Sequence, residues 1–163
     1  MAEIFQHIVF GSLISTLVGS LFSVLIAYEI VAKRARFTYQ PLYLFNEIMT
    51  IGGLILLWFY IENLVFVFTL LALLSIMYQL YKLFVSVYSS DKRFRLLILA
   101  LGASRLEYSK FVLEKNLGKV FGNLIKFYTL SLISFLISLT PYASDIGFFS
   151  LIIGLILTLL QVD

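Results

Sequence analysis

The chain has 163 residues, of which 61% are hydrophobic and only 13% are charged, and its net charge is +3. A soluble domain contains roughly 45–50% apolar and about 25% charged residues, so this composition cannot cover a water-exposed surface. The chain has no cysteine and one histidine, His7, which excludes disulfides, cysteine nucleophiles and thiolate metal sites. We therefore expect an all-α membrane helix bundle that forms a single transmembrane domain over residues 1–163, with no cofactor.

Five apolar segments are long enough to be membrane spans, because crossing the hydrocarbon core takes about 20 residues. The last of them is short. The segment nearest the N-terminus has no Lys or Arg before it and no small-residue cleavage site after it, so we expect it to be retained rather than removed as a signal peptide. The predicted spans are residues 8–31, 41–61, 64–81, 117–139 and 146–162.

The basic residues predict how these spans are oriented. If the N-terminus is outside, all twelve Lys and Arg residues fall on the inner side, in two inner loops or at inner span ends. Lys82, Lys119 and Lys126 lie at such ends, where long side chains can reach the interface. The outer segments contain no Lys or Arg. This is the positive-inside pattern, and it predicts about five transmembrane helices with the N-terminus outside.

Few polar residues lie within the predicted spans. Glu29 and Glu47 sit near inner span ends, where pairing with Arg34 or Arg36 costs little. A carboxylate inside a membrane is a candidate functional group, but neither lies at the midplane, so we do not expect a proton relay. No paired carboxylates or histidine cluster lies at membrane depth, which disfavours an intramembrane enzyme.

Small residues recur at every fourth position of the first predicted span. Such a stripe lets another helix backbone approach closely. Two interpretations remain open, because the partner helix can belong to the same bundle or to another subunit. The stripe consists of Gly11, Ser15, Gly19, Ser23 and Ala27.

Between the third and fourth predicted spans, residues 92–116 are expected to remain on the inner side. The segment 91–102, DKRFRLLILALG, is too short to span and is predicted to form an amphipathic helix. Gly102 stands where a helix end favours left-handed backbone angles. The segment Ser104–Glu107, SRLE, matches a capping box, so a second helix is predicted to begin at Arg105. The expected element is a cytoplasmic helix, a glycine corner and a capped helix.

This element resembles the cytoplasmic coupling loop of ABC-transporter permeases. In the binding-protein-dependent importers, the pattern is E-A-A, three residues, G-A, and then I-x-L-P. Gly102 and Ala103 match the G-A pair, and Val112 stands at the Ile position. The methionine-type permeases of that family also have five spans, an outer N-terminus and this loop between spans three and four.

The chain departs from that pattern at two places. The E-A-A positions are occupied by residues 96–98, LLI, and the Leu-Pro positions by Glu114 and Lys115. The macrolide-exporter and cell-division type permeases also have LGAS followed by F-L-x-E, which the segment Phe111–Glu114, FVLE, resembles. Those proteins have four spans and a large extracellular domain, for which this chain has no room.

The resemblance implies a permease subunit that couples a separate ATPase to substrate translocation, because the chain lacks a G-x-x-x-x-G-K-[ST] motif. The implied partners are membrane lipid, a cytoplasmic ATPase and a second membrane subunit, in a prokaryotic inner membrane and without nucleic acid. The alternative is a non-catalytic accessory subunit of a larger membrane complex. The residues expected to form the ATPase-docking corner are Arg95, Leu97, Leu101, Gly102, Ala103, Ser104, Arg105, Glu107 and Tyr108.

Overall fold

The computed structural model describes residues 2–33, 40–88, 100, 102 and 104–160 of the chain. These residues form helices and connecting turns with no strand, so the predicted all-α fold is confirmed. Four of the helices are long and apolar enough to cross a membrane. The elements are α1 (Ala2–Lys33), the 3-10 helix η1 (Gln40–Phe45), α2 (Glu47–Tyr60), α3 (Leu64–Tyr88), α5 (Arg105–Ser138) and α6 (Ala143–Leu160).

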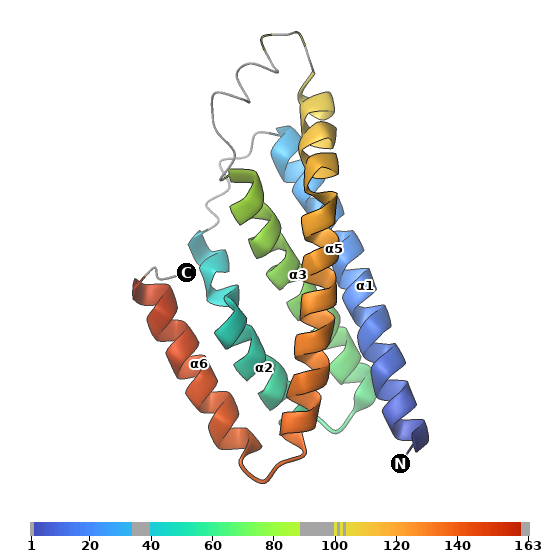
Figure 1. Ribbon diagram of the computed structural model, residues 1–163, viewed down its shortest axis with the longest axis vertical. Coiled ribbons are helices and arrows are strands. Elements are labelled where there is room, and N and C mark those ends of the chain that lie inside the picture. Colours follow the sequence, from blue (N-terminus) through green and yellow to red (C-terminus); the bar gives the residue numbers. More distant parts are fainter. Residues whose placement is uncertain (1, 34–39, 89–99, 101, 103, 161–163) are drawn as a thin grey trace.

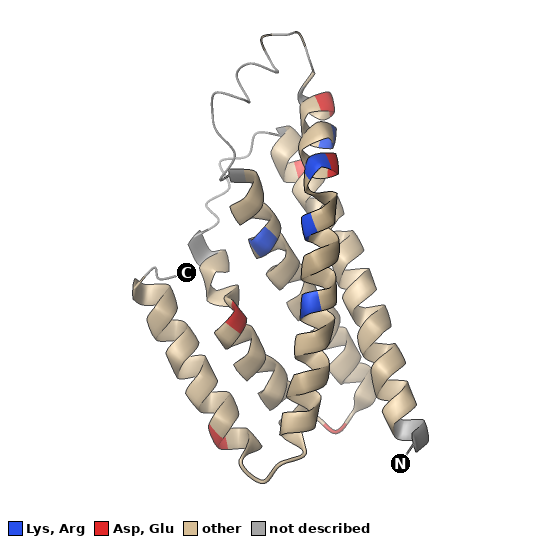
Figure 2. Cartoon of the chain, in the orientation of Figure 1, with Lys and Arg blue, Asp and Glu red and all other residues tan. Residues whose placement is uncertain are grey.

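The helices run alternately up and down, and α5 is central to the bundle (Figure 1). It contacts α1, α2, α3 and α6. The other main pairs are α1 with α3 and α2 with α6, so α6 is a peripheral helix held mostly by α2. The basic residues coloured in Figure 2 lie on α3 and α5, away from the end where α5 leads into α6. This placement agrees with one side of the bundle facing the cytoplasm.

The second predicted span is interrupted. Residues 41–61 were expected to be one helix, but the chain forms η1 and then α2, which has only 14 residues. A helix of that length rises about 21 Å, less than the roughly 30 Å of a bilayer core. The break occurs at Asn46, whose backbone is extended (φ −61°, ψ 163°) and whose side chain caps α2.

The fourth predicted span and the second helix of the inner corner are one continuous element. The helix α5 has 34 residues, about 51 Å at the usual rise, so its first turns extend beyond the membrane core on the inner side. The predicted first and third spans also continue further, to Lys33 and to Tyr88. The fifth begins three residues earlier than expected, at Ala143, and residues 161–163 lie outside the described part.

The interior is divided into two apolar clusters. One gathers buried side chains of α1, α3 and α5 toward the inner end, including Ala27, Phe84 and Tyr108. The other joins α2, α3 and α5 through Leu54, Tyr78 and Phe127. Large aliphatic and aromatic side chains also cover the outside of α1 and α6, as expected where the surrounding solvent is lipid.

Candidate functional site

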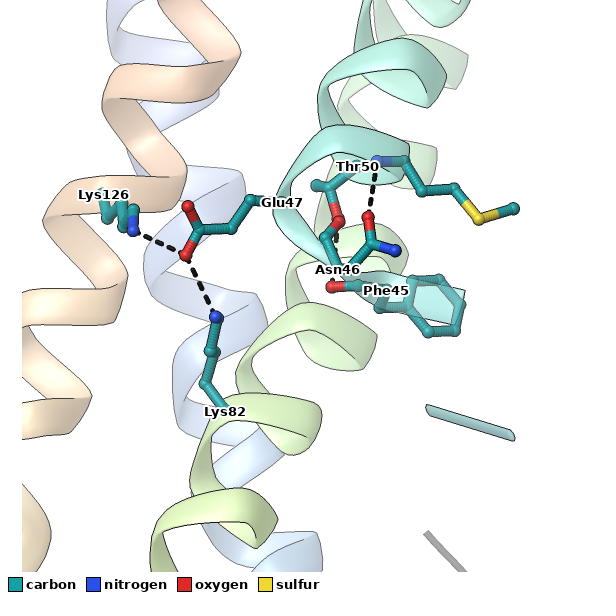
Figure 3. A network of polar contacts seen from close by, with 7 residues as sticks. Phe45, Asn46, Glu47, Thr50, Lys82 and Lys126 are labelled. Carbon is teal, nitrogen blue, oxygen red and sulfur yellow. Dashed lines mark hydrogen bonds and ion pairs between the residues drawn. The ribbon is translucent and has the colours of Figure 1, made fainter. Parts of the chain in front are cut away.

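The interruption between η1 and α2 is held together by the side chains of Asn46 and Thr50, which Figure 3 shows, and by Thr158 of α6. Asn46 Oδ1 accepts a hydrogen bond from the Met49 N–H at 2.8 Å, which satisfies one of the free donors at the start of α2. Asn46 Nδ2 donates to the Gly154 carbonyl oxygen at 2.8 Å and to Thr158 Oγ1 at 3.0 Å. One side chain therefore caps α2 and ties it to α6.

Two threonine hydroxyl groups complete this junction. The single Thr158 hydroxyl proton lies between two acceptors, the Gly154 carbonyl oxygen at 2.9 Å from Oγ1 and the Tyr43 carbonyl oxygen at 3.2 Å. The Thr50 hydroxyl donates to the carbonyl oxygens of Asn46 at 2.8 Å and of Phe45 at 3.3 Å. Non-helical backbone at membrane depth is tolerated where protein groups replace the lost helical hydrogen bonds, and these side chains provide that replacement.

The first residue of α2 carries the carboxylate of a three-residue charge cluster. Glu47 Oε1 lies 2.6 Å from Lys126 Nζ on α5 and 3.0 Å from Lys82 Nζ on α3, and Figure 3 shows the carboxylate between the two ammonium groups. The start of a helix also favours negative charge. The cluster therefore joins three helices through one carboxylate.

The sequence suggested that pairing of Glu47 with Arg34 or Arg36 would cost little, and those two residues lie outside the described part of the chain. The described partners of Glu47 are Lys82 and Lys126, which the sequence analysis did not assign to it. The signal for Lys126 was available, because Glu47 and Lys126 lie about 20 and 18 Å from the outer ends of their helices at the usual rise per residue. Lys82 starts nearer the inner end of α3, and its long side chain reaches back to the same carboxylate.

Lys82 also lies against aromatic rings. Its ammonium nitrogen is 5.4 Å from the Tyr81 ring centre and 5.9 Å from the Tyr78 ring centre. The electron-rich ring faces attract a cation at such distances. The Tyr81 ring packs edge-on against Tyr43 of η1, with centres 5.7 Å apart. The aromatic contacts therefore fix Lys82 beside the interrupted segment.

A second polar connection between α3 and α5 lies further toward the inner side. Lys119 Nζ donates to Ser86 Oγ at 2.7 Å, and the Ser86 hydroxyl donates to Asn116 Oδ1 at 2.7 Å. Asn116 is buried and its amide nitrogen donates to the Val112 carbonyl oxygen at 2.8 Å. This connection and the Glu47 cluster form two successive polar contacts between the same two helices.

The predicted glycine corner has the expected local geometry. Gly102 has φ +88°, a left-handed conformation that favours glycine. The Ser104 N–H donates to Glu107 Oε2 at 2.7 Å, and the Glu107 N–H donates to Ser104 Oγ at 3.2 Å. Both halves of the predicted capping box are present, and the helix begins at Arg105 as expected.

The residues of the expected docking corner differ in accessibility. Ser104 and Glu107 are exposed, whereas only 7% of Tyr108 is exposed. Tyr108 belongs to the inner apolar cluster with residues of α1 and α3, and the next residue, Ser109, donates to the Tyr28 carbonyl oxygen at 3.1 Å. Tyr108 therefore packs inside the bundle. Outside the described part lie Arg95, Leu97, Leu101, Ala103 and the side chain of Arg105.

The small-residue stripe of α1 is directed into the bundle. An added Cβ on Gly19 would lie 2.5 Å from Ser75 Cβ and 2.8 Å from the Ala72 carbonyl oxygen, both on α3. An added Cβ on Gly11 would overlap the Phe68 ring of α3. Internal packing accounts for the stripe. Its other members, Ser15, Ser23 and Ala27, are buried.

The described residues contain no group of three His, Asp or Glu side chains able to hold a metal ion. His7 and Glu29 are both exposed. Comparison of the chain with protein-family models, with curated proteins and with solved structures gives no match.

Proposed function

We propose that this chain is the membrane-spanning permease subunit of an ATP-driven transporter in a prokaryotic inner membrane. A separate ATPase subunit would dock at the glycine corner and supply nucleotide hydrolysis, and a second membrane subunit would complete the pathway. The observation that carries this proposal is that the capped corner begins α5, which contacts every other described α-helix.

The continuity of α5 gives this arrangement a mechanical role. A force applied near Ser104 acts on a single hydrogen-bonded helix that extends to Ser138 at the outer side. Since packed helices move as stiff units, displacement of the inner end would shift the contacts of α5 with α1, α2 and α3 together. This is the type of motion that alternating access requires.

The interrupted second span adds support for a transport role. Broken membrane helices and intramembrane charges mark substrate or ion pathways in many transporters. Here the break at Asn46 is adjacent to Glu47, which is paired with Lys82 and Lys126. A subunit that only fills space has no requirement for either feature.

A second candidate function, that of an accessory packing subunit, is favoured by the burial of Tyr108. The first turns of α5 contribute to the core of the bundle, so the capped helix start can serve stability alone. The two candidates differ in what they bind on the inner side.

Purification of the tagged protein from its native membrane in mild detergent, with mass identification of its partners, tests the proposal. We expect a stoichiometric P-loop ATPase with the native chain. Gly102→Val should lose it, because a β-branched residue is strained at φ +88°. Gly102→Asn is the matched control and should keep the ATPase, since Asn tolerates left-handed angles. Recovery of other membrane subunits without an ATPase would support the accessory function instead.

A further inference from the structure

The facing surfaces of α3 and α5 carry a set of three lysines, Lys82, Lys119 and Lys126, which we call the lysine ladder. Lys119 and Lys126 are seven residues apart on α5 and therefore lie on the same face. Both reach toward α3, Lys119 through Ser86 and Lys126 through the carboxylate that Lys82 also contacts. The ladder is thus one continuous basic surface along the contact between two helices.

The positive charge of the ladder exceeds the negative charge that the described residues bring to it. Glu47 is the carboxylate within ion-pair distance of Lys82 and Lys126, and Lys119 donates to the neutral hydroxyl group of Ser86. Three ammonium groups therefore face one carboxylate. Unbalanced charge at membrane depth is unfavourable unless another group compensates it, so the ladder is suited to an additional anion.

The depth of the ladder indicates where that anion resides. Lys82 and Lys119 lie about 27 and 28 Å from the outer ends of α3 and α5 at the usual helical rise, close to the roughly 30 Å thickness of the hydrocarbon core. The exposed Lys119 side chain can extend toward the headgroup layer at this depth, whereas the Lys82 ammonium is directed back to Glu47. The Lys119 ammonium therefore lies nearest the level of the inner-leaflet phosphates, and the other two lysines lie deeper, at Glu47.

The ladder is also accessible from its surroundings. The side chain of Lys126 is 47% exposed and that of Glu47 is 37% exposed, and Lys119 is exposed as well. The interruption of the second span, which leaves α2 with 14 residues, starts at the level of Glu47. A headgroup phosphate can therefore approach Lys119 from the lipid side, and the partly exposed pair of Lys126 and Glu47 lies below it.

We propose that the lysine ladder binds the phosphate of an anionic phospholipid in the inner leaflet. Basic surfaces between membrane helices on the cytoplasmic side are suited to such headgroups. A zwitterionic headgroup carries its own cation and cannot neutralise the ladder, so the surface should discriminate between the two lipid classes. Glu47 already neutralises part of the positive charge of this surface. Fewer phosphates can therefore bind there.

The test is native mass spectrometry of the whole protein after reconstitution in vesicles made of equal parts of phosphatidylcholine and phosphatidylglycerol. We expect retained phosphatidylglycerol to exceed retained phosphatidylcholine. Lys119→Gln should lower phosphatidylglycerol retention about fivefold, which is the contribution of one lysine near an anionic surface. Lys119→Arg should keep it, and Glu47→Gln should raise it, because the competing carboxylate is removed.

Lys110→Gln is the matched control, since Lys110 lies on the same helix but its side chain is 72% exposed and pairs with Glu114 at 3.8 Å. It should leave lipid retention unchanged. Equal retention of the two lipids, or equal loss in the Lys110→Gln and Lys119→Gln variants, would overturn the proposal. Displacement of phosphatidylglycerol by added inorganic phosphate would also overturn it, because the site would then select a free anion. If Glu47→Gln fails to fold, the exposed Lys119 variants still decide the question.

Discussion

At the scale of single residues, Glu47 connects three helices through one carboxylate. It begins α2 and pairs with lysines of α3 and α5 at 3.0 and 2.6 Å. Fully exposed ion pairs contribute little to stability, whereas removal of one partner of a buried pair costs several kcal/mol. These side chains are between one quarter and one half exposed. We therefore expect their contribution to the free energy of unfolding to lie between those of an exposed and a buried ion pair.

We predict that Glu47→Gln lowers the free energy of unfolding by about 1–2 kcal/mol, because two ammonium groups lose their carboxylate. The measurement is unfolding in mixed detergent micelles, followed by circular dichroism. Lys126→Gln should cost less in the Glu47→Gln background than in the native chain. Equal costs in both backgrounds would show that the two residues are not coupled.

The glycine corner belongs to the same scale, and here the sequence was sufficient to predict the local backbone geometry. Gly102, Ser104 and Glu107 interact with residues at most three positions away, so their spacing alone indicates a left-handed turn followed by a capping box. Both are present in the structure. The docking role of Tyr108 could not be judged in this way, because its burial depends on the distant helices α1 and α3.

At the scale of elements, α1 and α3 approach closely along a surface of small residues. No hydrophobic effect drives helices together in lipid, so close backbone packing is an important source of stability. Gly19 lies directly against Ser75 and the backbone of Ala72. The four-residue period indicated a packing surface, and the structure identifies α3 as the helix against which it packs.

We expect Gly19→Ala to lower the free energy of unfolding by about 1–3 kcal/mol, because the added methyl group forces α1 away from α3. Gly122→Ala is the matched control, since nothing lies within 4 Å of an added Cβ there. That variant should leave stability unchanged or slightly raised, as alanine favours helix. The same detergent unfolding assay compares the two, and an equal loss would contradict close packing at Gly19.

The second span is the element whose form differs most from expectation. Its residues are apolar throughout most of 41–61, so hydropathy alone predicts one helix. Asn46 followed by Glu47 is a typical helix start, a local signal that the sequence analysis did not use and that marks the observed start of α2. The stability of the break depends on Thr158 and Gly154 of α6, more than 100 residues away.

At the scale of the whole molecule, the alternating helices leave the described charges unequally distributed. The coloured basic residues of α3 and α5 lie away from the end where α5 leads into α6 (Figure 2), and the turn between α5 and α6 has no basic residue. This asymmetry supports the predicted orientation with the N-terminus outside.

The absence of cysteine from the sequence allows a direct test of orientation. We predict that a membrane-impermeant maleimide labels Thr140→Cys in intact cells, because this exposed residue lies in the outer turn. Lys110→Cys, in the exposed first part of α5, should react only after permeabilisation. The reverse labelling pattern would show that the bundle is inserted in the opposite orientation, with the glycine corner outside.

The sequence by itself determined the properties that depend on composition or on neighbours along the chain. These are the all-α fold, helices long and apolar enough to cross a membrane, the left-handed Gly102 and the capping box. The orientation stays a prediction, and the helix predicted over residues 91–102 lies almost entirely outside the described residues. Hydropathy, charge bias and capping each require only local information.

Only the tertiary structure decided how distant segments meet. It brought Glu47 to Lys82 and Lys126, anchored Asn46 to α6, and buried Tyr108 between α1 and α3. Each of these contacts depends on the rotation and relative depth of separate helices. A helix sequence limits the faces that can be buried, but the partner and the register are set by packing among all of the helices at once.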